Sequence, residues 1–63
     1  MENDRAELAA LATSLDELAS RVTAAADRFA GTPRADLADG LYEVERSLLT
    51  AARKLDRVVR AMR

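Results

Sequence analysis

The sequence predicts an all-α fold: an antiparallel two-helix hairpin that pairs with a second copy into a four-helix bundle. Two observations predict the hairpin. Apolar residues recur at gaps of three and four along two long stretches, which places each set on one side of a helix. A glycine and a proline separate the two stretches. A third observation predicts the pairing, because the second stretch carries more apolar residues than one neighbouring helix can cover.

The first stretch predicts a helix over about residues 4–30. Asp4 and Glu7 have the spacing of a capping box, in which each side chain bonds a free backbone N–H of the first turn. No proline or glycine interrupts residues 4–30, so we expect one continuous helix. Its apolar stripe comprises Leu8, Leu11, Leu15, Leu18, Val22, Ala25 and Phe29.

Gly31, Thr32 and Pro33 predict the turn. Glycine commonly ends a helix in the left-handed conformation, threonine caps the next helix, and proline suits its first position. We therefore expect the second helix over about residues 33–62. Its apolar stripe comprises Leu37, Leu41, Val44, Leu48, Ala51, Leu55, Val58 and Met62.

Gly40 is the weak point of the second helix. Glycine costs about 1 kcal/mol relative to alanine inside a helix. One alternative is a break there, with Asp39 capping a helix that starts late. We favour a continuous helix, because Leu37, Leu41 and Val44 keep their spacing across the glycine.

The two stripes match when the helices run antiparallel, with Phe29 level with Leu37 and Leu8 level with Val58. We therefore predict that the stripes form the contact between the two helices. A second apolar surface runs along one flank, and we predict that it is the self-association interface. This flank comprises Ala12, Ala19, Ala26, Ala38, Tyr42, Leu49, Ala52 and Val59.

Length and composition narrow the range of possible functions. The 63 residues allow one small domain, which buries only about 60% of its unfolded surface and gains from self-association. The chain has no cysteine and no histidine, which excludes disulfides, thiolate nucleophiles, the usual zinc sites and an imidazole base. It opens on an acidic segment and has no long apolar run, so we expect a cytoplasmic protein. The abundance of arginine and alanine suggests a bacterial source.

A row of arginines follows the outward side of the second helix. It comprises Arg46, Arg53, Arg57 and Arg60. Guanidinium groups in a row can hold the phosphates of nucleic acid or a nucleotide. The alternative is a solvated surface, with Asp56 paired to Arg60. No aromatic side chain is interleaved for base stacking.

The other candidate functional residues have weaker support from the sequence. Asp36, Asp39 and Glu43 could ligate a hard cation, but acidic residues at the start of a helix are expected from its dipole. Tyr42 is the only tyrosine and lies on the predicted interface, with no titrating partner that the sequence reveals. Glu45 lies on the same flank, either bridging a partner's arginine or marking the interface edge. We expect no metal, no cofactor and no catalytic residue.

We therefore expect a non-enzymatic, self-associating helical hairpin for protein–protein interaction, with an adaptor, regulatory or structural role. Its partners would be a second copy of itself and another protein, with no role at a membrane. The alternative is an anion-binding regulator that uses the arginine row on nucleic acid or a nucleotide.

Overall fold

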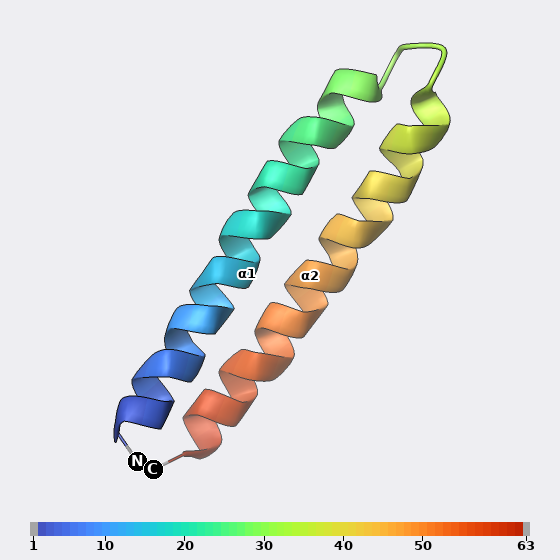
Figure 1. Ribbon diagram of the computed structural model, residues 1–63. Coiled ribbons are helices and arrows are strands. Elements are labelled where there is room, and N and C mark those ends of the chain that lie inside the picture. The colour runs from blue at the N-terminus through green and yellow to red at the C-terminus, as the bar shows by residue number, and fades with distance from the viewer. Residues whose placement is uncertain (1, 63) are drawn as a thin grey trace.

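The computed structural model describes residues 2–62, which form two helices, α1 at Glu2–Phe29 and α2 at Ala35–Ala61. The helices lie side by side and antiparallel, with both chain ends at one end and the connecting turn at the other (Figure 1). The Cα atoms extend over 50 × 14 × 9 Å, so the hairpin is a single thin layer. The predicted all-helical hairpin is confirmed.

The start of α1 differs from the prediction. The helix begins at Glu2, so Asp4 and Glu7 lie inside its first two turns and Asp4 does not occupy the capping position. Their carboxylates still lie near the positive end of the helix dipole, where negative charge is favourable.

The turn reverses the chain through Gly31, as predicted. Gly31 has φ +79°, the left-handed region that other residues adopt at a cost. The N–H of Ala30 donates to the Ala26 carbonyl at 3.1 Å and that of Thr32 to the Phe29 carbonyl at 3.1 Å. These bonds satisfy carbonyl groups that the end of α1 leaves free.

The start of α2 also corrects a prediction. The helix begins at Ala35, two residues later than predicted, and Arg34 rather than Thr32 occupies the capping position. Thr32 instead stabilises the turn before the helix. Its hydroxyl accepts the Arg34 N–H at 3.1 Å and donates to the Phe29 carbonyl at 2.6 Å. The Thr32 carbonyl accepts the Ala35 N–H at 3.1 Å, so Pro33 belongs to a tight turn before the regular helix.

Helix α2 runs without a break through Gly40 and ends at Ala61. The continuous helix is therefore confirmed, and a start after Asp39 is excluded. An added Cβ on Gly40 would meet no atom within 4 Å.

The contact between the helices is centred on a different stripe from the predicted one, whose residues are half-buried or exposed. Over residues 3–62 six residues are buried, and all six belong to the flank that we predicted for self-association. They are Ala12, Ala19 and Ala26 of α1 and Ala38, Ala52 and Val59 of α2. Tyr42 and Leu49, the other two residues of that flank, are half-buried. The prediction that this flank is left free for a second copy is therefore wrong.

Small side chains explain why the alanine rows lie at the centre of the contact between the helices. Alanines at every seventh position let two helix axes approach closely, and their backbones then pack almost directly. Ala26 is 0% exposed and Ala38 2%, so the contact is tight near the turn. Relative to the predicted arrangement, each helix is rotated about its axis by roughly a fifth of a turn.

The predicted stripes instead form one broad surface, which we call the leucine face. None of its fifteen residues is buried. The face comprises Leu8, Leu11, Leu15, Leu18, Val22, Ala25 and Phe29 of α1 and Leu37, Leu41, Val44, Leu48, Ala51, Leu55, Val58 and Met62 of the α2 side.

Candidate interaction surfaces

The leucine face spans both helices, and ten of its fifteen residues are half-buried while five are exposed. Leu11, Leu18, Val44 and Val58 are 47, 43, 46 and 50% exposed, and Leu37 is 36% exposed. Isolated exposed apolar residues are ordinary, but a continuous apolar face of this length is typical of an interaction surface.

Charged residues border the leucine face in an ordered way. On α1, Arg21 and Arg28 lie beside Leu18 and Leu41 around a shallow hollow near the turn. Glu7 lies on the same side of α1 as these arginines, because it precedes them by multiples of seven residues. It therefore borders the leucine face at the end nearest the chain termini. The border of α1 is therefore acidic at the termini and basic at the turn.

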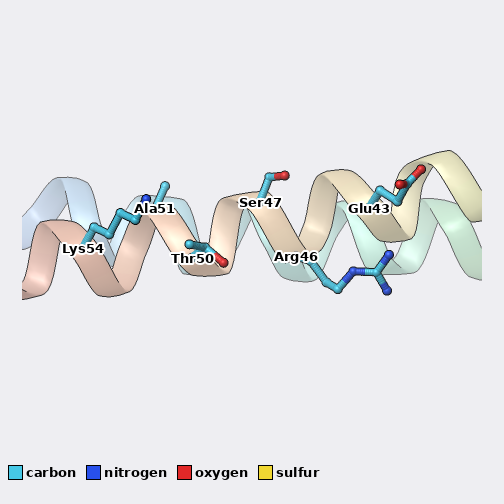
Figure 2. Close-up of a pocket in the computed structure, with 6 residues that line it drawn as sticks. All are labelled: Glu43, Arg46, Ser47, Thr50, Ala51 and Lys54. Atoms are coloured by element: carbon cyan, nitrogen blue, oxygen red, sulfur yellow. The ribbon is translucent and has the colours of Figure 1, made fainter.

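The border of α2 has the opposite order. A hollow on the outer surface of α2 is lined by Glu43, Arg46, Ser47, Thr50, Ala51 and Lys54 (Figure 2). Ala51 belongs to the leucine face, which places Glu43 and Lys54 close to its edge. Glu43 lies toward the turn and Lys54 toward the termini, so this border is acidic at the turn and basic at the termini.

One polar pair interrupts the contact between the helices. Glu45 is the member of the seven-residue row of Ala38, Ala52 and Val59 that is not apolar, and it is half-buried. The Thr23 hydroxyl donates to Glu45 Oε2 and also lies 3.1 Å from the Ala19 carbonyl oxygen. Glu45 therefore bonds within the hairpin, which neither interpretation from the sequence anticipated. Its row of small residues was the signal that it faces α1.

Tyr42 has a titrating partner after all. Its hydroxyl donates to Asp27 Oδ1 at 2.6 Å. This hydrogen bond is the main reason that the pKa of Tyr42 is raised above its ordinary value near 10, with burial and the negative charges of Asp27, Glu45 and Asp39 adding to it. Asp27 and Tyr42 lie on opposite helices, so sequence spacing alone did not reveal the pair.

Asp36, at the start of α2, pairs with the nearby Arg34. Arg34 donates through Nε and Nη2 to the two carboxylate oxygens of Asp36, each at 3.1 Å. This pair lowers the pKa of Asp36, assisted by the N–H groups of Asp36 and Leu37 and opposed by burial. Within residues 2–62 no three potential ligands gather closely enough to hold a metal ion.

All four members of the arginine row are exposed. Arg60 pairs with Asp56 at 2.8 Å, as the solvated-surface interpretation expected. Arg46, Arg53 and Arg57 have no carboxylate within 4 Å in the part of the chain that the structure describes. Arg53 shares a shallow groove between the helices with Asp16 and Asp56.

Over the described residues, neither helix has a stretch long and apolar enough to cross a membrane. No family model, no characterised protein and no solved structure matches the chain.

Proposed function

We propose that the protein is a non-enzymatic interaction module that self-associates through its leucine face into a four-helix bundle and uses its outer surfaces to bind another protein. The observation that carries this proposal is the leucine face, five of whose large apolar side chains are 36 to 50% exposed. Two hairpins stacked face to face would remove it from water, at about 25 cal/mol for each Å² of apolar surface buried. A four-helix bundle is the common architecture for such layers.

The dimensions of the hairpin support a second copy as the occupant. The layer measures 50 by 14 Å over its Cα atoms. Such a face is on the order of the ~800 Å² that each partner buries in a stable complex. Among the residues whose burial is described, the hairpin buries only five alanines and one valine, and five large apolar side chains are at least 36% exposed.

The charged borders support the same occupant. Two copies related by a two-fold axis can stack with their turns at the same end or at opposite ends. When the turns coincide, the basic end of each α1 border lies over the acidic end of the partner's α2 border. When the turns lie at opposite ends, the basic end of each border lies over the acidic end of the same border on the partner. Either arrangement brings Arg21 and Arg28 toward carboxylates, and electrostatic complementarity of this kind favours correct association.

A matched pair of α1 variants tests the pairing. Leu18→Glu introduces a carboxylate on the leucine face, and Ser20→Glu introduces the same group on the exposed opposite side of the same helix. A carboxylate buried in an apolar interface without a partner costs several kcal/mol. At about 100 μM, we expect Ser20→Glu to sediment as a dimer and Leu18→Glu as a monomer.

Circular dichroism on both variants separates association from folding. Loss of the dimer in Leu18→Glu alone, with or without loss of helix, agrees with the proposal because a hairpin without its partner is under-supported. If Leu18→Glu remains a dimer, or if both variants dissociate alike, the leucine face is not the interface.

A further inference from the structure

We infer that the arginine row of α2 is a binding surface for the phosphate backbone of double-stranded nucleic acid. Between Arg46 and Met62 the chain carries five basic residues, and Asp56 is the one acidic residue. Arg60 is partly neutralised by Asp56, whereas Arg46, Arg53 and Arg57 are exposed and have no ion pair with another described residue. The protein has net charge −1, so this local concentration of positive charge is a separate feature of α2.

The position of the row leaves it accessible. Arg46 lies two residues from both Val44 and Leu48, and two residues correspond to about 200° around a helix. Arg53 and Arg60 repeat this placement at intervals of seven residues. The row therefore lies on the side of α2 opposite the leucine face. It is available whether or not two hairpins pair, so this inference does not rest on the proposed function.

The spacing of the row favours a polymer over a small anion. Arg46 and Arg60 are fourteen residues apart, which corresponds to about 21 Å along the helix axis. Charges spread over this length cannot converge on the phosphates of one nucleotide. Phosphates on one strand of duplex DNA recur every ~3.4 Å along the axis, so the same length spans about six base pairs. Guanidinium groups bind such phosphates well.

Two further observations favour a duplex over other polyanions. The row contains no aromatic side chain on which unpaired bases could stack, since the two aromatics are Phe29 and Tyr42. Helices that lie in a membrane surface commonly carry Trp or Phe on the apolar face. The α2 part of the leucine face has no aromatic residue.

The test is binding of the full chain to a fluorescently labelled duplex of about 20 base pairs, followed by anisotropy at several NaCl concentrations. The slope of log K against log salt is about −0.9 for each phosphate contacted. Four arginines therefore predict a slope of about −3 to −4. The variant Arg53→Gln/Arg57→Gln should bind at least about tenfold more weakly near 50 mM salt, with a slope smaller in magnitude by about 2.

Arg5→Gln/Arg34→Gln is the matched control, because it removes the same charge from exposed positions outside the row and away from the charged borders of the leucine face. We expect it to retain most of the affinity and the full salt slope. All four substituted positions are exposed, and circular dichroism verifies the folding of each variant. The inference is overturned if the unsubstituted protein does not bind the duplex, if both double variants weaken binding equally, or if vesicles of anionic lipid are bound and the duplex is not.

Discussion

At the level of single residues, the two glycines serve different purposes. Gly31 adopts φ +79° in the turn, where a residue with a Cβ is strained. Gly40 lies within α2, and open space surrounds the position of an added Cβ. The same substitution should therefore have opposite effects at the two sites.

We expect Gly31→Ala to lower the free energy of unfolding by about 1 kcal/mol, because alanine resists the left-handed conformation. We expect Gly40→Ala to raise it by about 0.5 to 1 kcal/mol, because alanine loses less backbone entropy in a helix. Denaturant unfolding at one fixed protein concentration measures both changes. Equal effects of the same sign would show that Gly31 is not held in the left-handed turn.

Tyr42 provides a pH-dependent signal at the same level. As the only tyrosine, it reports on its own ionisation by ultraviolet absorbance, and we expect a titration midpoint above the ordinary value near 10. Asp27→Ala removes the acceptor of its hydrogen bond and should move the midpoint down, whereas Asp16→Ala should leave it unchanged. Because the pKa is raised in the folded protein, the associated stabilisation is present below the ordinary pKa and is lost as the pH rises through the higher folded value. A midpoint that does not move in Asp27→Ala would contradict the Tyr42–Asp27 contact.

At the level of helices, the sequence predicted much of the fold. The spacing of apolar residues, together with Gly31 and Pro33, was sufficient to locate two antiparallel helices and their turn. It was not sufficient to select the stripe that forms the contact. The leucine stripes and the alanine rows share the same seven-residue period, so periodicity alone does not rank them. The close approach that Ala26 and Ala38 permit is a property of the packed pair.

The alanine contact has a direct test. Ala26 is fully buried against α2, so Ala26→Leu overfills the contact and should lower the free energy of unfolding by about 1 to 3 kcal/mol. Ala10 is exposed on the same helix, and Ala10→Leu should change stability by less than about 0.5 kcal/mol. Thermal unfolding under matched conditions compares the two. Similar melting temperatures for both variants would mean that the alanine rows do not form the helix contact.

At the level of the whole molecule, three surfaces run along the hairpin. The alanine rows hold the two helices together, the leucine face is the surface that we propose a second copy covers, and the arginine row lies opposite that face on α2. The sequence identified all three sets of residues and predicted the exposure of the arginine row. It did not place the alanine rows in the contact between the helices, because placing Ala12 or Leu11 there depends on how far each helix rotates. The pairs Thr23–Glu45 and Asp27–Tyr42 depend on the same rotation, which is why they emerged only in the packed structure.

The central claim is that the leucine face is covered by a second copy, and the mass of the unsubstituted protein in solution tests it most directly. Sedimentation equilibrium at about 100 μM should give about twice the 6.9 kDa of one chain. Dilution should lower the mass and the helical circular dichroism together, because a single layer of two helices is under-supported without its partner. A species of 6.9 kDa that keeps its full helicity at this concentration would contradict the claim.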